Sequence, residues 1–499
     1  MANPSLQIGN SKWAIKKDNL LGYSTAGTRF LPIPITMTRA SAGTRVNAQG
    51  LVETVELLGS EQVVNGNFAT DSDWTKSGGV TISDGKANIN GDGTSFAAIT
   101  QANVFTVGKI YKVTADVIIT SGLGLKFQDG ANNENIGFAT TTGFYTFYFT
   151  ATSNTSIVIG RRTGGTAFNS SIDNVSVKES TRNDLARVDY TGSTSSLLAE
   201  PQRTNLVTYS SDFSDSSYVK SGVTVISDYA TSPDGTLNAS KLTFTSTGEI
   251  LQSMSFVVGE QYTFSFYAKT ETGTFDFTLG NMAYYLESAT ATTEWQRFTV
   301  TQSAVATTRY PKIDASTSGD LLVWGWQIEE GSYATSYIPT SGSTVTRVQD
   351  QYTKTGISDK INSEEGVLFV EIENITGTDA PNKMISITDG SLTNKISIFV
   401  SSNRINVESA GSGTNFAIYS KALQSGFNKI AVKYKVNDCA MWVNGTEYTD
   451  TSFAAFSSNT FNTLLFDRGD GLQDFYGKVK QLQVYKTALT DTQLAALTS

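Results

Sequence analysis

Apolar and polar residues alternate in several short segments of this chain, most clearly at Tyr111–Val117 and Tyr262–Lys269. Successive side chains of a β-strand point to opposite faces, so this period of two predicts strands with one face on a core and the other in water. Further apolar runs, at Phe144–Phe149 and Trp295–Val300, are set apart by turns rich in Ser, Thr, Asn and Gly. Short strands at such intervals are typical of antiparallel sandwiches.

The stretch from Trp74 to Glu179 is repeated from Tyr218 to Glu330, with different residues but with the same order of short turn and aromatic motifs. Trp-Thr-Lys-Ser-Gly at 74–78 answers Tyr-Val-Lys-Ser-Gly at 218–222, and Phe-Thr-Val-Gly at 105–108 answers Phe-Val-Val-Gly at 256–259. Self-similarity over roughly one hundred residues is longer than a solenoid repeat. The pattern therefore predicts two related domains, and a third domain in the remaining C-terminal part.

The C-terminal part carries two local signals. Asn444-Gly445 lies between two apolar runs and predicts a tight hairpin turn. Thr490 is followed three residues later by Gln493, with Leu489 and Leu494 beside them. This arrangement has the form of a capping box and predicts a short helix there.

Composition supports an all-β fold. The 499 residues are too many for one hydrophobic core, and Gly (43) is plentiful while Pro (8) is scarce and charged residues make up only 17%. We predict three antiparallel β-sandwich (jelly-roll) domains in tandem, with an extended N-terminal segment.

Charge and hydropathy exclude several classes of protein. The net charge is -9 and Lys and Arg form no stripe, which disfavours nucleic-acid binding. No apolar run approaches the length of a membrane span, and the N-terminus lacks the features of a signal peptide. We expect no nucleic-acid partner, no membrane insertion, and synthesis in a cytoplasm.

The chain contains no histidine and one cysteine, Cys439. Without imidazole there is no His-activated nucleophile, no His general base and no His zinc site. Cys439 stands in a strand-like run, where we expect it to fill a small core position.

Residues 1 to 45 differ from the rest, because short apolar clusters alternate with basic residues there and strand-like alternation is rare. Such a segment can bury little surface alone, so we expect a partner, or copies of itself, to order it. The alternative is a strap that lies on a domain of its own chain.

Asp467, Asp470 and Asp474 form a candidate calcium site in a Gly-rich loop, because calcium prefers hard oxygen ligands. Arg468 offers the alternative, since it can neutralise the loop without a metal. No other cofactor is expected.

Five aromatic residues are candidates for glycan binding, because aromatic rings can stack on the apolar faces of sugars. Each of them could instead be a core residue, since aromatic side chains supply large buried areas. The candidates are Trp74, Tyr218, Tyr284, Tyr285 and Trp295.

Each duplicated domain, opening with Asn65-Gly-Asn-Phe68 and closing with Ile172–Val177 in the first copy, resembles the jelly-roll carbohydrate-binding modules found beside polysaccharide-degrading enzymes. The C-terminal domain, through Gly477–Asp491, resembles a concanavalin A-like or laminin-G-like sandwich. Sandwich glucanases of that class carry a Glu-x-Asp-x-x-Glu strand. Here Glu371-Ile-Glu373-Asn-Ile-Thr376 has Glu for the central Asp and Thr for the final Glu, so we expect no catalysis.

Three further stretches resemble virion fibre and adhesin proteins of tailed bacteriophages, of the type that infects Bacteroidetes. In such proteins, the equivalent of Gly50-Leu51 runs directly towards Glu200-Pro201, so the first jelly roll reads as an insertion. The stretches are Leu6–Leu51, Glu200–Leu206 and Gly325–Pro339.

The resemblance implies five segments along the chain. They are an N-terminal virion-attachment segment (1–62), an inserted carbohydrate-binding-like jelly roll (63–180), a return linker (181–204), a second jelly roll (205–345) and the concanavalin A-like domain (346–499).

What the resemblance implies for function is a structural virion protein, a head or tail fibre that adheres to host surface polysaccharide. Its N-terminal segment would dock on other virion proteins, and a homo-oligomer, most plausibly a trimer, would complete that segment. A capsid decoration or spacer protein without a ligand, and a glycan depolymerase, are the alternatives. The residues assigned to attachment are Trp13, Leu20, Tyr23, Phe30 and Arg39.

Overall fold

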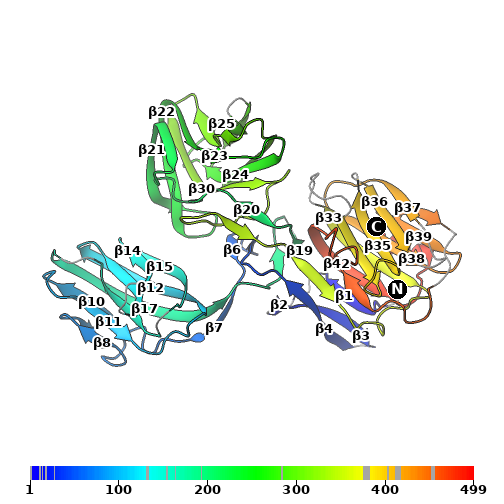
Figure 1. The fold of residues 1–499 in the computed structure, drawn as a ribbon, viewed down its shortest axis with the longest axis horizontal. Helices are drawn as coiled ribbons and strands as arrows, with labels where there is room; N and C mark the ends of the chain where they lie inside the picture. The colour runs from blue at the N-terminus through cyan, green and yellow to red at the C-terminus, as the bar shows by residue number, and fades with distance from the viewer. Residues whose placement is uncertain are drawn as a thin grey trace. The chain divides into compact units, whose positions relative to one another are not determined.

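The computed structural model of the chain is built almost entirely from antiparallel strands and has one described helix (Figure 1). The predicted class, all-β with antiparallel sandwiches, is confirmed. The structure describes residues 3–10, 13, 15–16, 19–26, 29–130, 134–152, 155–162, 165–192, 194–282, 285–374, 383–401, 404–410, 417–450 and 456–499.

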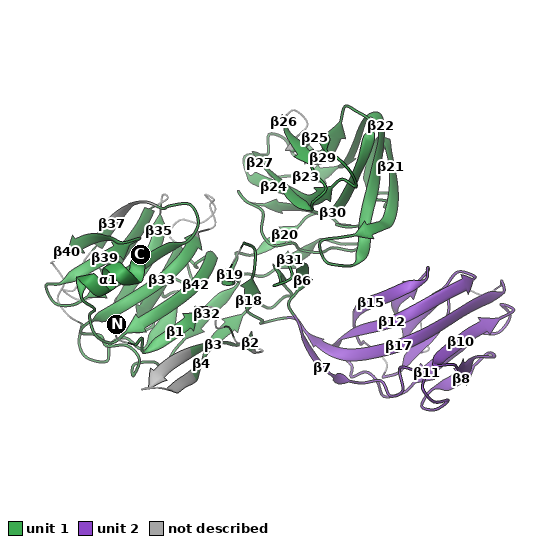
Figure 2. Ribbon diagram, turned by 180° about the vertical axis from the view of Figure 1, so that it is seen from behind, with its two compact units in different colours: residues 1–55, 183–499 green, residues 56–182 purple. Residues whose placement is uncertain are grey.

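The chain divides into two compact units (Figure 2). Unit 2 comprises Glu56–Arg182, and unit 1 comprises Met1–Val55 together with Asn183–Ser499. Unit 1 contains two sandwiches: a middle sandwich (residues 205–345) and a composite sandwich built from residues 6–38, 187–199 and 351–498.

Unit 2 is a sandwich of two antiparallel sheets, in the orders β15-β12-β17-β10-β9, with β7 on β17, and β14-β13-β16-β11-β8. Along β12, Tyr111, Val113, Ala115 and Val117 are buried and alternate with half-buried polar residues, as the period of two predicts. Its strands are β7 (Leu57–Glu61), β8 (Thr75–Ser77), β9 (Thr81–Ser83), β10 (Lys86–Gly91), β11 (Ala98–Gln101), β12 (Ile110–Ser121), β13 (Leu125–Asp129), β14 (Glu134–Ala139), β15 (Gly143–Thr150), β16 (Ile157–Arg161) and β17 (Phe168–Thr181).

The middle sandwich is joined through one long strand, β22, whose first half pairs with β30 and whose second half pairs with β29. The strand order is β26-β25-β29-β22-β30-β24-β27, with β21 on β22. Its strands are β20 (Arg203–Asn205), β21 (Tyr218–Thr231), β22 (Leu237–Gln252), β23 (Met254–Ser255), β24 (Gln261–Lys269), β25 (Phe275–Met282), β26 (Tyr285–Ala291), β27 (Gln296–Ser303), β28 (Thr308–Arg309), β29 (Lys312–Ala315), β30 (Gly319–Glu330) and β31 (Val345–Arg347).

Strand β24 departs from the expected pattern of one buried and one wet face. Thr263 and Ser265, on the polar face, are fully buried. Their hydroxyl groups are satisfied by Thr301 (2.7 Å) and by the Arg297 guanidinium (2.9 Å). A buried hydroxyl that is hydrogen-bonded costs little, so polarity alone did not reveal this second buried face.

The composite sandwich consists of two strand paths linked by one pairing, Gln7 to Tyr23. The first path is β1-β42-β33-β38-β39-β40 and the second is β3-β4-β32-β41-β34-β35-β36-β37. The strands and the helix are β1 (Leu6–Gly9), β2 (Ile15–Lys16), β3 (Asn19–Ala26), β4 (Arg29–Thr38), β18 (Arg187–Asp189), β19 (Ser196–Ala199), β32 (Gln351–Lys354), β33 (Gly366–Asn374), β34 (Lys383–Thr388), β35 (Lys395–Ser401), β36 (Arg404–Ala410), β37 (Ala417–Ala422), β38 (Asn428–Tyr434), β39 (Cys439–Val443), β40 (Thr446–Asp450), β41 (Thr463–Leu465), β42 (Gly477–Tyr485) and α1 (Asp491–Thr498).

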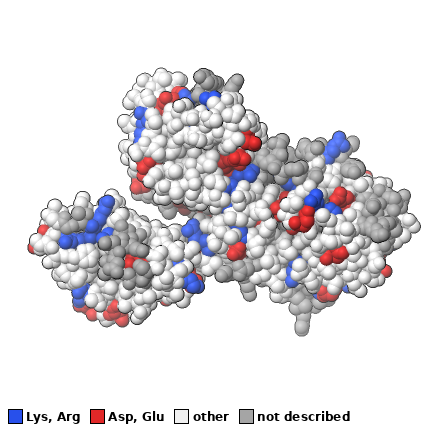
Figure 3. Space-filling view, in the orientation of Figure 1, with Lys and Arg blue, Asp and Glu red and all other residues white. Residues whose placement is uncertain are grey.

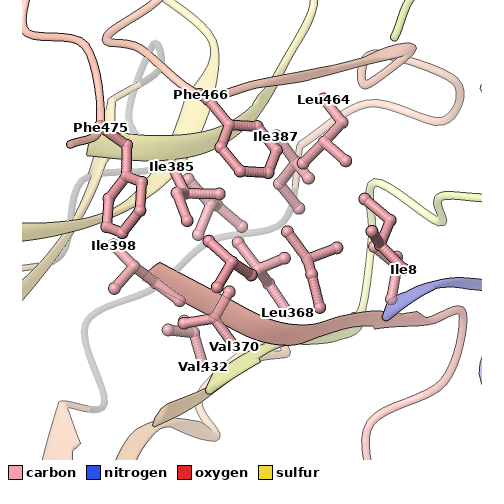
Figure 4. Packing of buried hydrophobic residues seen from close by; sticks show 14 of the residues in the cluster. Ile8, Leu368, Val370, Ile385, Ile387, Ile398, Val432, Leu464, Phe466 and Phe475 are labelled. Carbon is pink, nitrogen blue, oxygen red and sulfur yellow. The ribbon is translucent and has the colours of Figure 1, made fainter. Parts of the chain in front are cut away.

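The N-terminal strands complete the core of this composite sandwich. Leu6, Ile8, Leu20, Ile35 and Met37 have no exposed surface and belong to the same apolar cluster as the C-terminal strands, and Figure 4 draws Ile8 in this cluster together with Leu368 and Val370. Each such side chain contributes about 1.5–3 kcal/mol when buried. The alternative for this segment, a strap on its own domain, therefore describes the structure, and no partner is needed to order these strands.

The residues assigned to attachment follow from this correction. Leu20 is fully buried, the Trp13 indole donates to the Ser195 hydroxyl (3.0 Å), and Arg39 is buried in an ion pair. These three contact their own chain, where Leu20 and Arg39 are buried and Trp13 is half-buried. Tyr23 and Phe30 lie in β3 and β4, and their side chains are outside the described part of the structure.

Both local signals of the C-terminal part are confirmed. Asn444 and Gly445 have φ of 47° and 81° and turn β39 into β40, as a type I′ hairpin requires. Thr490 caps α1 and Gln493 closes the capping box. Cys439 is buried in the composite core, as expected. No helix in the described part of the chain is long and apolar enough to span a membrane.

Two pairs of antiparallel strands carry the chain into and out of unit 2 and the middle sandwich, which we call the outer domains. β7 pairs with the end of β17, where Leu57 faces Thr181, and β20 pairs with β31, where Arg203 faces Arg347. Val52 and Thr54 in β6 (Val52–Thr54) pair with β5 (Thr44–Val46) just before the first crossing. Each outer domain thus leaves and re-enters the chain at neighbouring points.

Five buried charged side chains within unit 1 form one ion-pair network, which we call the junction network. Arg39 pairs with Asp350 (2.7 Å), Arg187 pairs with Asp350 and with Glu200 (2.6 Å), and Arg347 pairs with Glu200 (2.9 Å). No side chain among them is more than 4% exposed. The network joins three parts of the chain. Arg39 precedes unit 2, Arg187 and Glu200 lie between unit 2 and the middle sandwich, and Arg347 and Asp350 follow the middle sandwich.

Charge pairing keeps the network ionised despite its burial. Burial alone would raise the pKa of Glu200, but the Arg347 and Arg187 charges hold that pKa far below its ordinary value. Arg187 and Arg39 lower the pKa of Asp350 in the same way. Because both folded pKa values lie below the unfolded ones, this stabilisation is present at neutral pH and is lost as the pH falls through the folded values.

Replacing Asp350 with Asn is expected to destabilise unit 1 by about 3–5 kcal/mol, because Arg39 would keep a buried charge without a carboxylate and Arg187 would share only Glu200 with Arg347. Calorimetric unfolding of the full chain measures this effect. The unfolding transition of unit 2, which contains none of these residues, should be unchanged in this variant. The control variant is Lys109→Gln, which breaks an exposed pair with Glu179 and should leave both unfolding transitions unchanged. An unchanged unit 1 transition in Asp350→Asn would contradict the role of the network.

Excision of residues 57–181 with a short Gly-Ser linker should leave unit 1 folded. Leu57 and Thr181 are cross-strand partners, whose Cα atoms lie about 4.5–5.5 Å apart, so a few residues close the gap. Circular dichroism and calorimetry check this expectation. Loss of cooperative unfolding in the excised protein would show that unit 1 depends on unit 2.

Candidate functional site

The repeated aromatic pair, Trp74 and Tyr218, lies in the two cores. The Trp74 ring packs 5.4 Å from Phe68, and the Tyr218 ring packs 5.4 Å from Phe213. Trp74 is 5% exposed and Tyr218 is 3% exposed, and each donates a hydrogen bond to a backbone carbonyl, at 3.1 and 2.6 Å. Both are packing residues at equivalent positions, and neither presents a ring face to a sugar.

Of the other three predicted aromatic residues, the structure describes the side chain of Trp295. Tyr284 lies outside the described residues, and Tyr285 begins β26 with a side chain that the structure does not describe. Trp295 is half-buried, donates its indole N–H to the Thr231 carbonyl (3.2 Å) and has the Lys269 ammonium 5.3 Å from its ring. Its ring packs on a small apolar cluster of the middle sandwich.

The three aspartates proposed for calcium do not converge. Asp470 pairs with Arg468 (2.5 Å), Asp467 accepts the Gly469 amide, and Asp474 contacts the Tyr476 hydroxyl (3.2 Å). Over the described residues there is no group of three or more Asp, Glu, Cys or His placed to hold a metal ion. Arg468 thus neutralises Asp470 directly.

The best catalytic candidate, Glu371, is also engaged. It is 5% exposed, with the Lys480 ammonium at 3.1 Å and the Gln481 amide at 2.7 Å. Lys480 and Gln481 of the neighbouring strand β42 cover this carboxylate, so it does not lie free in solvent.

Exposed aromatic side chains gather on unit 2 instead. Four of the six exposed Phe and Tyr residues in the described part of the chain lie within its span: Phe96 (45% exposed), Phe138 (39%), Phe144 (66%) and Tyr148 (37%). Exposed aromatic rings gain free energy when a ligand or partner removes them from water, so rings gathered on one domain mark a candidate interaction surface. They occupy two opposite faces of the sandwich.

Phe96 and Phe138 share the outer face of the sheet β14-β13-β16-β11-β8, which we call the Phe96 face. Cross-strand partners in adjacent strands point to the same side of a sheet. A single row of such partners crosses this face: Ser77, Ala98, Gly160, Lys126 and Phe138.

A glycine in that row makes room for the Phe96 ring. A Cβ atom at Gly160 would lie 2.9 Å from Cζ of Phe96 and 2.7 Å from Cβ of Ala98, closer than side chains approach. The ring therefore rests on the sheet over Gly160, and Ala98 beside it is only 2% exposed although it points outward. The opposite side of the ring stays open, since Phe96 is 45% exposed.

Two cations accompany the rings of the Phe96 face. Lys126 lies in the row between Gly160 and Phe138, and the Arg162 guanidinium lies 4.7 Å from the Phe138 ring. Among the described residues, neither cation takes part in an ion pair. Phe138 is two strands from Gly160, about 10 Å away, so the face suits an oligosaccharide better than a single sugar ring.

The opposite sheet face holds Tyr148, whose polar contacts are already made. Its hydroxyl donates to Glu56 (3.0 Å), Glu56 also pairs with Lys112 (2.7 Å), and the Arg182 guanidinium lies 4.4 Å from the ring. Burial and the Glu56 charge raise the pKa of Tyr148. With its ring covered by Arg182 and its hydroxyl bound, Tyr148 offers less to a sugar than Phe96 does.

The face of the molecule drawn in Figure 3 shows no extended basic patch that would offer a second candidate site. It is mostly uncharged, with Lys and Arg in small separate groups. The sequence analysis missed Phe96, Phe138 and Lys126, because they stand outside the clear alternating segments. The signal that could have indicated them was a glycine inside an apolar strand, Ile157–Arg161, which marks a close approach over the sheet.

No protein-family model and no curated protein matches the chain. Solved structures similar to it include the CBM40 of Ruminococcus gnavus IT-sialidase (17% identity, 28% of this chain, 84% of that one, TM-score 0.24) and the CBM22-1-CBM22-2 tandem domain of Paenibacillus barcinonensis Xyn10C (12%, 55%, 98%, 0.21). Trypanosoma rangeli sialidase with sialic acid is a third (7%, 95%, 87%, 0.23). Two of these three are carbohydrate-binding modules, but TM-scores of this size establish no common fold.

Asp474 provides a pH-dependent prediction. Burial, reinforced by the Asp467 charge, raises the pKa of Asp474 to about 6, while an unfolded aspartate titrates near 3.9. The stabilising, protonated form is complete below about pH 4 and is lost as the pH rises to about 6. Asp474→Asn should therefore raise the melting temperature at pH 7.5 and leave it unchanged at pH 4.

The matched control for that measurement is Asp470→Asn, because Arg468 lowers the pKa of Asp470. This variant should gain nothing at pH 7.5. An equal gain for Asp474→Asn at both pH values would refute the assignment, and a calcium-dependent rise of the wild-type melting temperature would show that the loop binds the ion.

Proposed function

We propose that this protein is a structural, glycan-binding protein whose Phe96 face binds host surface polysaccharide, and that it is displayed on a bacteriophage particle as a fibre or adhesin. The observation that carries the proposal is the pair of exposed rings on one sheet face, Phe96 resting over Gly160 and Phe138 beside Arg162. Open aromatic rings next to hydrogen-bond donors fit the apolar faces and hydroxyl groups of sugars.

The charges of the Phe96 face favour an acidic glycan. Lys126 and Arg162 are donors without an ion-pair partner among the described residues, and both lie beside the exposed rings. Charge-assisted hydrogen bonds to a carboxylate are roughly twice as strong as neutral ones. A polysaccharide that carries uronic acids would therefore satisfy both the rings and the cations.

Display on a virion is supported by the resemblance of three stretches, two of which build the junction network through Arg39 and Glu200. Since the N-terminal strands complete the composite sandwich, we propose that the whole composite sandwich docks on other virion proteins. A homo-oligomer, as a trimer, would place several Phe96 faces on one fibre, and repeated weak contacts raise avidity by effective concentration.

A spacer without a ligand and a glycan depolymerase are the competing functions. The spacer leaves the exposed rings of unit 2 without a role. For the depolymerase, the strand that resembles the catalytic one has Glu371 bound to Lys480 and Gln481. Release of reducing ends from host polysaccharide by the purified protein would support the enzyme.

Replacing Phe96 or Phe138 with Ala in the full chain should weaken binding of oligogalacturonate about tenfold or more, or ~1.4 kcal/mol. Titration calorimetry against the carboxyl-reduced, neutral oligomer separates ring contacts from charge, and Lys126→Ala should affect only the acidic ligand. Phe144→Ala is the matched control, because this exposed ring lies on the other sheet face. If Phe144→Ala lost binding and Phe96→Ala did not, the site would lie on the opposite sheet, and the proposal for the Phe96 face would be wrong.

Virion display has a separate test. Purified particles of the phage that encodes this chain should contain its peptides by mass spectrometry, and antiserum against unit 2 should reduce adsorption to host cells. Absence of the peptides from particles would overturn the virion role while leaving glycan binding intact.

A further inference from the structure

We propose that the middle sandwich carries a second saccharide site, on the sheet face equivalent to the Phe96 face, and that this site takes a glycan bearing free amino groups. The inference rests on the proposed glycan-binding function and extends it to a second ligand class. Its location is a groove of about 560 Å³ over β25, β26 and β29.

The equivalence of the two faces follows from strand register. In unit 2 the row of cross-strand partners is Ser77, Ala98, Gly160, Lys126 and Phe138. The row that starts at the repeated Lys-Ser-Gly sequence of the middle sandwich is Ser221, Glu249, Asp314, Thr278 and Ser288.

The duplicated rows keep their geometry but exchange their chemistry. Lys126 is replaced by Thr278, Phe138 by Ser288, Gly160 by Asp314 and Ala98 by Glu249. A face with a cation and aromatic rings in unit 2 thus becomes a face with hydroxyl groups and carboxylates in the middle sandwich. The two faces cannot favour the same ligand.

The groove is lined by side chains that point away from the core. Phe277, Leu279 and Ile313 are buried, so the residues that alternate with them along β25 and β29 face outward. The polar lining residues are Asp276, Thr278, Ser288, Thr290, Asp314 and Ser316. Four hydroxyl groups and two carboxylates therefore converge on one hollow.

Existing contacts fix the orientation of the carboxylates. Asp276 accepts a hydrogen bond from the Thr290 hydroxyl (2.6 Å), and Lys312 pairs with both Asp314 and Glu249 at 2.8 Å. One ammonium thus pairs with two carboxylates, and Asp276 has no ion pair among the described residues, so the groove keeps an excess of negative charge. An acidic sugar is repelled, while an ammonium group finds acceptors already in place.

The described lining of the groove offers no exposed aromatic ring for a sugar to stack on, so the affinity for a ligand depends on charge. The aromatic residue of the groove, Phe277, is 3% exposed and offers no open face. Without a ring to cover, neutral sugars would gain only hydroxyl hydrogen bonds of modest net strength. Charge-assisted bonds from an amino sugar to Asp276 and Asp314 supply the missing affinity.

The experiment titrates the full chain with a glucosamine oligomer and, in parallel, with the N-acetylated oligomer of the same length. The unacetylated oligomer should bind at least tenfold more tightly and should weaken as salt is added, because screening acts on exposed charges. Equal affinity for both oligomers, or no binding of the unacetylated one, would overturn the inference.

Variants locate the site. Asp276→Asn and Asp314→Asn should each weaken the glucosamine oligomer about fivefold to tenfold, in keeping with loss of one charge-assisted bond. Asp320→Asn is the matched control, because Lys241 also bridges two carboxylates there, Asp320 at 2.7 Å and Glu271 at 3.0 Å, outside the groove. Loss of binding in this control would point to general charge attraction and contradict the site.

Failure of this inference is distinguishable from failure of the proposed function. Phe96→Ala should abolish oligogalacturonate binding and leave glucosamine binding unchanged, while Asp276→Asn should do the reverse. Oligogalacturonate binding without glucosamine binding removes only the second site. Glucosamine binding that Phe96→Ala abolishes would assign both ligands to unit 2 and refute the second site.

Discussion

The junction network is the constraint on which the rest of unit 1 depends. Three guanidinium groups and two carboxylates are buried together, and an unpaired charge at such depth costs several kcal/mol. Arg39, Arg187, Glu200, Arg347 and Asp350 come from stretches far apart in the chain, so pairing them fixes where each stretch passes. Within unit 1, Glu200 stands just before β20 and Arg347 ends β31, so the charges lie at the two ends of the middle sandwich's connection. The network thus fixes where the chain enters and leaves the middle sandwich.

The same network explains the stretches that resemble phage fibre proteins. Thr38-Arg39-Ala-Ser41 supplies the guanidinium on Asp350, Glu200-Pro201 supplies the carboxylate between two arginines, and the Ser336 amide and hydroxyl bind Glu200 at 2.8 and 2.7 Å. Sequence analysis assigned Arg39 to a docking surface, because its carboxylate partner stands more than three hundred positions away. Pairs at that separation are invisible to local patterns, so the motif was recognised but its physical role was not.

Local signals predicted local structure well, and long-range pairing limited the rest. Asn444-Gly445 and the Thr490 cap needed only their neighbours in sequence, and both form as predicted. The N-terminal segment has too little alternation to predict strands from its sequence. Nevertheless β1 pairs with β42, whose edge would otherwise be unpaired along Gln481–Val484. Gly325, with φ of 69°, interrupts the alternation along β30, where the pairing with β24 shifts register: Trp326 joins the main core of the middle sandwich, while Trp324 packs in a separate cluster.

The duplication separates packing residues from binding residues. Trp74 and Tyr218 are repeated because both cores need a large ring against Phe68 or Phe213, and repetition of that kind reports a shared packing demand. The outer rows carry no such demand, since their side chains do not enter the core, and there the copies differ at nearly every position. A duplicated fold keeps what holds it together and is free to change what it presents. The outward-facing differences, rather than the repeated aromatic residues, are therefore where the two sandwiches acquire separate ligands.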